Sequence, residues 1–321
     1  MQSPGGVSLD EPQLILGLGE LLWDLLPEGP RLGGAPANFS VMAGRLGNRA
    51  YVLSRIGNDS LGQQALDLLG TLPVDAAAIQ MDTRAETGSV TVSLNNGQPT
   101  YTIHEPAAWD FLEASEEWLL LAQRANAICF GSLAQREPVS RATIQKLVAA
   151  SGPTCVRVFD VNLRAPFYTA EILTESMAIA SVVKMNDAEV PLVLHLLGLE
   201  DAVDDRANNP GKAALRHGAE KILAAFPRLD LVVITCGGSG SLLVRRNEWH
   251  EHPGIAISIA DTIGAGDAFT AALTHYLLRG ATLAQLNEAG NQWGAFIASQ
   301  PGAMPHIPEQ ARAAIQRKIE G

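Results

Sequence analysis

The sequence predicts an α/β fold, a three-layer sandwich whose mostly parallel central sheet is flanked by helices and carries a small β-sheet lid. From residue 126 onward, short apolar runs alternate with helical patterns, which is typical of parallel β-α-β units. Residues 89–103 instead alternate polar and apolar positions, as expected for strands with one face in water. Aromatic residues make up only 5% of the chain, which favours helices packed closely on a sheet over a sandwich of aromatic strands.

The N-terminal part of the chain is predicted to begin with a buried strand. Residues 13–19 form a short apolar run that ends in glycines. The next predicted elements are a helix over 35–46, a strand over 51–55 and a helix over 61–72.

The lid is predicted from two segments, about 21–32 and 86–104. Within the second segment, residues 89–94 and 100–103 are extended, and Asn95-Asn96-Gly97 between them is a hairpin turn signal. Because this hairpin lies outside the β-α-β rhythm, we expect the lid to stand off a single α/β domain that spans 1–321.

The C-terminal part supplies most of the predicted sheet. Its apolar runs lie at 127–130, 155–160, 181–185 and 231–235, with helical patterns at 138–150, 169–180, 187–197 and 211–225. An extended pair at 241–245 and 248–252 then precedes two long helices at 265–278 and 283–299. In open parallel sheets ligands bind beyond the carboxyl ends of the strands, so the polar residues that follow each strand are the candidates for function.

Composition excludes two classes of partner. The net charge of −11 argues against nucleic acid or an anionic membrane surface, because both need clustered Lys and Arg. No run approaches the roughly 20 apolar residues of a membrane-spanning helix.

The three cysteines, Cys129, Cys155 and Cys236, are far apart and odd in number, which predicts free thiols in a reducing compartment. The first residues lack the basic and apolar regions of a signal peptide. We therefore expect a cytoplasmic protein.

The strongest chemical signal is the segment from Asp261 to Asp267, DTIGAGD, which precedes an amphipathic helix. Its glycines permit a tight turn, and the unpaired N–H groups of the helix start suit an anion such as a transferring phosphate. A carboxylate at Asp267 would repel that anion, so it makes sense as a base that takes a hydroxyl proton. The alternative is that Asp267 only caps the helix.

Four further polar sets follow predicted strands and are expected to converge at one edge of the sheet. They are Gly33-Gly34-Ala35-Pro36-Ala37-Asn38, Asp160-Val161-Asn162-Leu163-Arg164, Asn186-Asp187-Ala188-Glu189 and Thr235-Cys236-Gly237-Gly238-Ser239-Gly240. Each has a plain structural alternative. Arg164 could pair with Asp160 or Asp187, and Glu189 could be a solvated residue of a first helical turn.

The sequence lacks the motifs of several other enzyme classes. The chain has no G-x-x-x-x-G-K-[ST] phosphate loop and no protein-kinase H-R-D or D-F-G, and the glycines of residues 17–22 do not complete a dinucleotide fingerprint. His250 and His252 alternate on a strand without a third ligand nearby, which favours a surface strand over a metal site.

With these motifs in place, the sequence resembles the ribokinase-like (PfkB) family of carbohydrate kinases, and within it the fructokinases. GGAPANFSVMAGRLG at 33–47 is similar to the N-terminal signature of the family, and DTIGAGDAFTAAL at 261–273 to its C-terminal signature. GELLWDLLP at 19–27 is similar to the opening segment of fructokinases. The resemblance implies a ribokinase-like fold and ATP-dependent phosphorylation of a sugar hydroxyl.

The resemblance also implies roles for individual residues. Asp267 matches the general base, and the backbone of Gly264, Ala265 and Gly266 matches the anion hole. The positions that match the sugar site are Asp24, Gly33, Gly34, Asn38, Asn162 and Arg164. Those that match the nucleotide site are Lys184, Asn186, Thr235, Gly237 and Gly240. Asp24 could alternatively be the exposed side of a lid strand.

The implied cofactors are ATP, Mg²⁺ and a monovalent cation such as K⁺. Asn186 and Glu189 match the motif that organises Mg²⁺, largely through water, and Asp261 matches a residue near the monovalent cation. Neither segment of the lid carries Lys or Arg except Arg31, so a neutral sugar, D-fructose by resemblance, is expected rather than a phosphosugar.

Other functions remain open from the sequence. A kinase for ribose, 2-keto-3-deoxygluconate or a nucleoside is one alternative, and a non-catalytic sugar- or nucleotide-binding module is another. The exposed edges of a lid sheet also favour a homodimer.

Overall fold

The protein is described here from a computed structural model that covers residues 11–27, 29–95, 98–200 and 211–320. Two predictions fall outside these residues. They are the hairpin turn at Asn96-Gly97 and the absence of a signal peptide at residues 1–10. No helix within the described ranges is both long and apolar enough to cross a membrane.

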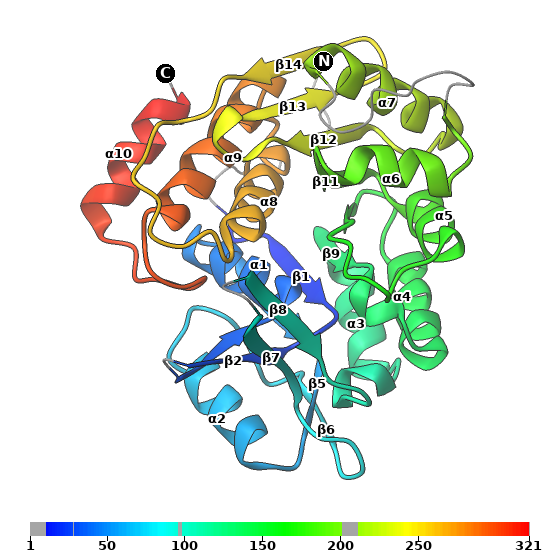
Figure 1. The fold of residues 1–321 in the computed structure, drawn as a ribbon, viewed down its shortest axis with the longest axis vertical. Coiled ribbons are helices and arrows are strands. Elements are labelled where there is room, and N and C mark those ends of the chain that lie inside the picture. Colours follow the sequence, from blue (N-terminus) through cyan, green and yellow to red (C-terminus); the bar gives the residue numbers. More distant parts are fainter. Residues whose placement is uncertain (1–10, 28, 96–97, 201–210, 321) are drawn as a thin grey trace, which may run out of the picture.

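The main sheet confirms the predicted parallel architecture (Figure 1). Within the described residues its order is β14-β13-β12-β11-β10-β9-β1-β4. From β4 to β12 all neighbouring strands in this order pair in parallel. Strand β13 pairs antiparallel with both β12 and β14. The strands are β1 (Leu14–Leu18), β4 (Arg49–Leu53), β9 (Ala127–Gly131), β10 (Val156–Asp160), β11 (Val182–Asn186), β12 (Leu231–Thr235), β13 (Ser241–Val244) and β14 (Trp249–His252).

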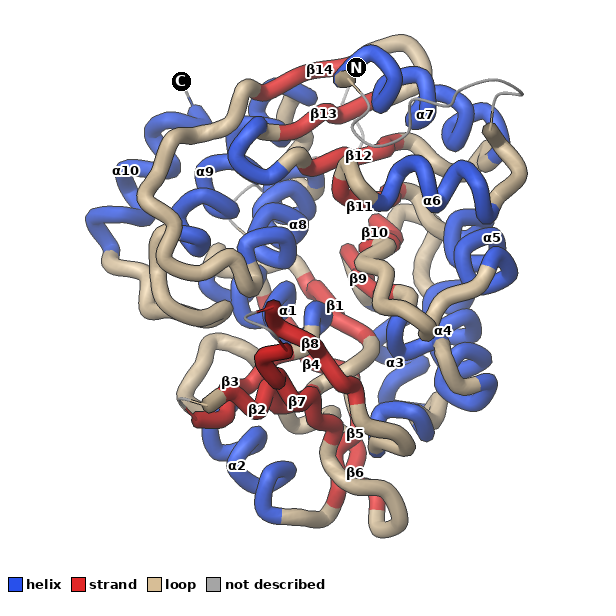
Figure 2. Tube along the Cα trace, in the orientation of Figure 1, coloured by secondary structure: helices blue, strands red, loops and turns tan. Residues whose placement is uncertain are grey.

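Helices cover both faces of this sheet, which completes the three layers (Figure 2). One face is covered by α1 (Ala35–Arg45), α8 (Ala265–Leu277), α9 (Leu283–Ala298) and α10 (Glu309–Glu320). The other face is covered by α3 (Glu116–Arg124), α4 (Pro138–Ala150), α5 (Ala170–Ile179), α6 (Glu189–Leu196) and α7 (Lys212–Ala225). Since central strands are buried on both faces, their sequences are continuously apolar rather than alternating.

A small separate sheet lies beside one end of the main sheet (Figure 2). Its order is β3-β2-β7-β8, formed by β2 (Leu22–Leu26), β3 (Gly29–Gly33), β7 (Gly88–Asn95) and β8 (Gln98–Ile103). Its inner face packs with α2 (Ser60–Leu69) in a separate apolar cluster that includes Leu21, Trp23 and Leu69.

Some elements had no counterpart in the sequence analysis. These are α3, α10 and a two-stranded parallel sheet of β5 (Arg55–Gly57) and β6 (Gln80–Asp82). The expected helix over 61–72 ends at Leu69 and begins one residue earlier than expected. It begins there because Asp59 is its N-cap and accepts the Gly62 N–H. The strands β5 and β6 are three residues long, too short for a periodic pattern to be visible.

Candidate active site

Helix α8 begins with a cradle of backbone N–H groups. Gly264 caps the helix at φ 78°, a left-handed conformation that glycine adopts readily, and a β-carbon there would lie 2.6 Å from the Cβ of Ala303. A β-carbon on Gly266 would lie 3.1 Å from Nζ of Lys184, so an ammonium group sits against the cradle. Because the first N–H groups of a helix lack partners within it, the arrangement suits an anion.

Asp267 lies in the first turn of α8 and keeps partial contact with solvent. Asn38, on α1, donates from Nδ2 to Oδ2 of Asp267 over 2.7 Å. Surrounding protein raises the pKa of Asp267 to about 6, and the charge of Asp160 adds to the rise. Lys184, the Asn38 hydrogen bond and Arg164 oppose it. A carboxyl with this pKa is mostly ionised at neutral pH and is a stronger base than an exposed aspartate.

A buried ionic network lies beside the N–H groups at the start of α8. Nζ of Lys184 on β11 donates to both carboxylate oxygens of Asp160 on β10, over 3.1 and 3.0 Å. Thr270 on α8 joins them by donating to Asp160 Oδ2 over 3.1 Å. Burial lowers the pKa of Lys184, but the charges of Asp160 and Asp267 outweigh it and raise the pKa overall, so the ammonium stays charged.

Glu189 ties two strand ends together rather than facing solvent. Its Oε1 accepts the Leu163 N–H and its Oε2 the Asn186 N–H, each over 2.8 Å, while Asn186 Oδ1 accepts the Glu189 N–H over 2.9 Å. The side chain is buried, so the alternative of a solvated helix residue is wrong. Since each carboxylate oxygen already accepts an N–H group, the pair fits Mg²⁺ through intervening water better than as direct ligands.

The loop after β10 is strained at Asn162, whose φ of 38° is unusual for a residue other than glycine. The preceding Val161 is buried, and its N–H donates to the Lys184 oxygen over 2.9 Å. Arg164 is exposed and, among the described residues, forms no ion pair with Asp160 or Asp187.

Arg164 and the small sheet approach the same space as Asp267. Burial raises the pKa of Asp24, while the charge of Arg164 lowers it and that of Asp261 raises it. A β-carbon on Gly33 would lie 2.8 Å from Oδ2 of Asp24, and Gly34 has φ 107° with a β-carbon position 2.4 Å from the Glu20 oxygen. The sugar-site candidates therefore gather between the small sheet, α1 and the loop after β10.

The nucleotide-site candidates lie on and after the neighbouring strands β11 and β12. Asn186 is paired with Thr235 at the ends of β11 and β12. Gly237 begins a 3-10 turn (Gly237–Ser239) at φ 52°, and Gly240 has φ 87° against the His252 backbone. The charges of Asp160 and Lys184 act on Asp267, which therefore lies near the ends of β10 and β11.

Asp261 has partners that leave little room for a cation at its side chain. Its Oδ2 accepts from Arg31 Nη1 over 3.1 Å and from the Gly302 N–H over 3.2 Å, and its Oδ1 accepts the Ile263 N–H over 3.0 Å. A monovalent cation could bind this carboxylate only by displacing Arg31.

Two residues near Asp267 were not singled out from the sequence, Glu20 and Thr270. Glu20 is almost fully buried, and its pKa rises to about 7 through burial. It directly follows the first strand, so the same rule that selected the other strand ends could have found it. Thr270 lies inside a helix, where no sequence signal distinguishes it.

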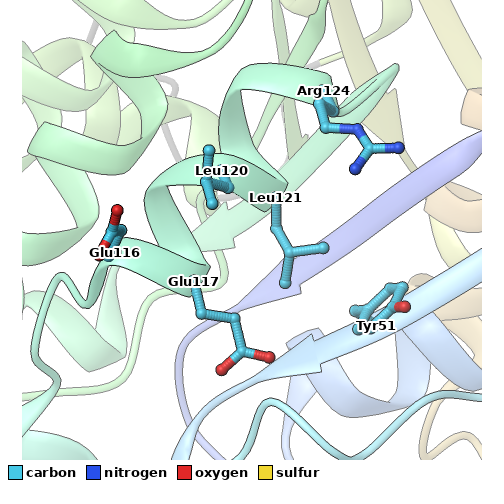
Figure 3. Close-up of a pocket in the computed structure, with 6 residues that line it drawn as sticks. All are labelled: Tyr51, Glu116, Glu117, Leu120, Leu121 and Arg124. Atoms are coloured by element: carbon cyan, nitrogen blue, oxygen red, sulfur yellow. The ribbon is translucent and has the colours of Figure 1, made fainter.

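Two further features of the described residues lie away from these strand ends. His250 and His252 lie on β14, the edge strand of the main sheet, as expected, but the His252 side chain is buried and bonded to Glu288 over 2.9 Å. Among the described residues, no cluster of three or more His, Cys, Asp or Glu is arranged to hold a metal. A hollow of about 380 Å³ lies between α3 and β4 and contains none of the candidates (Figure 3). It is lined by Tyr51, Glu116, Glu117, Leu120, Leu121 and Arg124.

Comparison with known proteins finds sugar kinases that match most of the chain. A putative sugar kinase of Pyrococcus horikoshii is 29% identical over 90% of this chain and 91% of its own length. Fructokinase-2 of Oryza sativa subsp. japonica is 27% identical over 94% of this chain and 93% of its own.

Solved structures of such kinases superpose on the chain as well. The fructokinase of Vibrio cholerae O395 with fructose, ADP and calcium superposes with a TM-score of 0.75 at 26% identity, covering 95% of this chain and 98% of that one. The P. horikoshii sugar kinase with ATP gives 0.78 at 27% identity, covering 95% of this chain and all of that one. The model of the pfkB family carbohydrate kinases matches residues 30–310, and with the fold and the two signatures this shows that the chain belongs to that family.

Proposed function

We propose that the protein transfers the γ-phosphoryl group of ATP to a hydroxyl of a small neutral sugar, and that this sugar is D-fructose. The observation that carries the proposal is the 2.7 Å hydrogen bond between Asn38 and Asp267, set at the α8 cradle beside Lys184. It presents a basic carboxylate next to a site for an anion. The names of the rice and Vibrio fructokinases support the choice of sugar.

In this proposal the sugar lies between the small sheet and the main sheet, with its hydroxyls at Asp24, Gly33, Gly34, Asn38, Asn162 and Arg164. ATP lies along the ends of β11 and β12, at Lys184, Asn186, Thr235, Gly237 and Gly240. The small sheet acts as the lid and excludes water that would otherwise accept the phosphoryl group.

The chemistry needs one proton transfer and one displacement. The sugar hydroxyl gives its proton to Asp267 while its oxygen bonds to the γ-phosphorus, and the bond from that phosphorus to the bridging oxygen breaks to release ADP. The N–H groups of Gly264, Ala265 and Gly266 offset charge on the transferring group, with Lys184 beside them.

Mg²⁺ bound with ATP would neutralise phosphate charge, and Asn186 and Glu189 would hold it through water. A K⁺ ion at Asp261 is proposed only for a state in which Arg31 has moved away.

The preference for a neutral sugar follows from the charges of the lid residues. Residues 87–110 and 19–30 contain no Lys or Arg, and Arg31 is already paired with Asp261. A second phosphate on the substrate would therefore find no free cation on the lid side.

The test compares kcat/KM with Mg·ATP for fructose, ribose, 2-keto-3-deoxygluconate, adenosine and fructose 6-phosphate. Fructose is expected to lead. If another substrate exceeds it tenfold, the sugar assignment fails while the kinase assignment stands. If none supports ATP turnover but sugar or ATP binds in calorimetry, the protein is a non-catalytic binding module.

We also propose a homodimer through the lid and a cytoplasmic location. The lid sheet ends in edge strands β3 and β8, which can pair with a second copy. The three cysteines are free, which fits a reducing compartment. Light scattering after size exclusion would report about 34 kDa for a monomer and twice that mass for the dimer.

A further inference from the structure

Arg136 is a buried cation in the loop after β9, at the edge of the main sheet where the proposed site lies. Its side chain is 3% exposed, and that of its partner Asp110 is 1% exposed. Nε and Nη2 of Arg136 donate to the two carboxylate oxygens of Asp110, each over 2.7 Å. Nη1 is buried and has no hydrogen-bond partner in the described part of the chain. Apolar side chains often stabilise a core as well as a buried ion pair does, so stability alone explains this pair poorly.

The first segment that Arg136 holds is the lid root, by which we mean residues 104–110 directly after β8. Nη2 also donates to the His104 oxygen over 3.1 Å, and the guanidinium lies 3.9 Å from the ring centre of Trp109. Trp109 is buried in the apolar cluster on the α3–α7 face of the main sheet. A β-carbon on Gly88, the first residue of β7, would overlap the indole nitrogen of Trp109. Arg136 therefore contacts the place where both strands of the lid hairpin meet the main domain.

The second segment that Arg136 holds is the loop after β10, which carries candidates for the sugar site. The guanidinium lies 4.8 Å from the ring centre of Phe167 in this loop. The Phe167 N–H donates to the Arg164 oxygen over 2.7 Å, so one backbone turn connects this contact to Arg164. The two loops also meet where Ser132 Oγ donates to the Val161 oxygen over 2.7 Å. One buried guanidinium thus joins the lid root to the loop after β10.

We propose that Arg136 is a positioning residue for the sugar: it joins the lid root to the loop after β10 and so sets the spacing between two sides of the proposed sugar site. The inference rests on the proposed function, in which the sugar lies between the small sheet and the main sheet. Arg136 acts through Asp110, Trp109 and Phe167 and is not itself a catalytic residue. A planar guanidinium suits this role, because it binds both oxygens of a carboxylate while its faces contact aromatic rings.

The first experiment compares the wild type with Arg136→Lys, which keeps the charge but loses the planar fork. For the sugar that the wild type prefers, we expect KM to rise about tenfold while the KM of ATP stays within about twofold, because only the sugar side is displaced. Arg141→Lys is the matched control. Arg141 also bridges two carboxylates, over 3.0 and 2.8 Å, but it joins α4 to α5 away from the proposed site. Its substitution should leave the sugar KM unchanged.

Variants of Phe167 test one contact of the guanidinium without altering the ion pair. Phe167→Leu removes the ring and should raise the sugar KM roughly threefold, whereas Phe167→Tyr keeps a ring and should stay close to the wild type. Phe226→Leu is the matched control, because Phe226 is also half-buried and packs against the same apolar cluster, at the end of α7.

Amide hydrogen exchange gives a readout that needs no turnover. Arg136→Lys should speed exchange in the lid root and in the adjoining ends of β7 and β8, while the amides of β11 and β12 keep their wild-type rates. If the wild type phosphorylates none of the sugars, the proposed function fails. The exchange rates then still decide whether Arg136 fixes the lid root.

Two results overturn the inference. One is an unchanged sugar KM, or an unchanged exchange rate in the lid root, in Arg136→Lys. The other is faster exchange in β11, β12 and the lid root alike, together with a lower melting temperature, which would make Arg136 a stability residue only. If Arg136→Lys fails to fold, the Phe167 variants decide: equal sugar KM values for Phe167→Leu and Phe167→Tyr overturn the inference.

Discussion

At Asp267, the surroundings that raise the pKa of the carboxyl also make its ionised form costly for the folded state. Surrounding protein and Asp160 raise its pKa to about 6, whereas an unfolded aspartate titrates near 3.8. The ionised form is therefore disfavoured by folding. This cost is fully present above pH 6 and disappears as the pH falls toward 4, because the folded protein then binds the proton first.

Asp267→Asn is expected to separate activity from stability. The amide cannot accept the hydroxyl proton, so kcat should fall by roughly 10² to 10⁴ while ATP binding persists. The free energy of unfolding should increase by an amount on the order of 1–2 kcal/mol at pH 8, which raises the melting temperature. This gain should shrink at pH 5. Kinetics and thermal melts at both pH values check this. A variant that retains more than a tenth of wild-type kcat would show that Asp267 is not the base.

Variants of Asn162 can separate an effect on sugar binding from an effect on stability, because the backbone of Asn162 is left-handed at φ 38°. Glycine tolerates this conformation and alanine does not, at a cost of about 1 kcal/mol. Asn162→Gly and Asn162→Ala should both raise the sugar KM, since both lose the amide, but only the alanine variant should also melt lower. Equal KM values for the wild type and Asn162→Gly would remove Asn162 from the sugar site.

Between elements, single side chains join loops that are far apart in sequence. Glu189 connects the start of α6 with the loops after β10 and β11, and Arg31 connects β3 of the small sheet with the Asp261 loop that precedes α8. The Arg31 contact links the proposed lid directly to the proposed anion hole.

Arg31→Ala should loosen this link. The Arg31 side chain is 43% exposed, so the pair contributes no more than about 1 kcal/mol and the sugar KM should rise by up to about fivefold. The difference from the wild type should shrink at high salt, because salt screens exposed pairs. Arg228→Ala, at an exposed position away from the small sheet, is the control. A salt-independent change would point to direct sugar binding by Arg31.

Across the whole molecule, three apolar clusters hold the elements together. The main sheet has a cluster on each face, and the third joins the small sheet and α2 to α1 and β4, through residues such as Trp23, Val41 and Val52. The described members of this third cluster include no residue of β7 or β8, so this hairpin of the proposed lid can move without disturbing the cluster.

Replacement of residues 89–102 by a short Gly-Ser turn tests this independence. The change removes most of β7 and β8, which belong to the small sheet alone. We expect a cooperative melt and native-like circular dichroism, with sugar kcat/KM strongly reduced and ATP binding retained. Global unfolding would instead show that the main fold requires the hairpin.

Much of this site could be read from the sequence because its residues follow strand ends. Apolar runs located the strands, and the rule that parallel strands end at one edge placed Asn38 and Asn186 in one region. The resemblance to the family added Lys184. The rule did not reveal which partner each side chain takes. Lys184 pairs with Asp160, and Glu189 turned out to be a buried cap, since such choices depend on distances between loops that sequence patterns do not encode.

The sequence by itself determined the layered α/β architecture, the family and the turn that begins α8, because hydrophobic periodicity and glycine placement are local properties of the chain. The tertiary structure alone decided the protonation chemistry. Burial and the charges of Asp160, Lys184 and Arg164 set the pKa of Asp267. These effects weaken with distance, so they exist only once the chain has folded and brought residues 160, 164, 184 and 267 together.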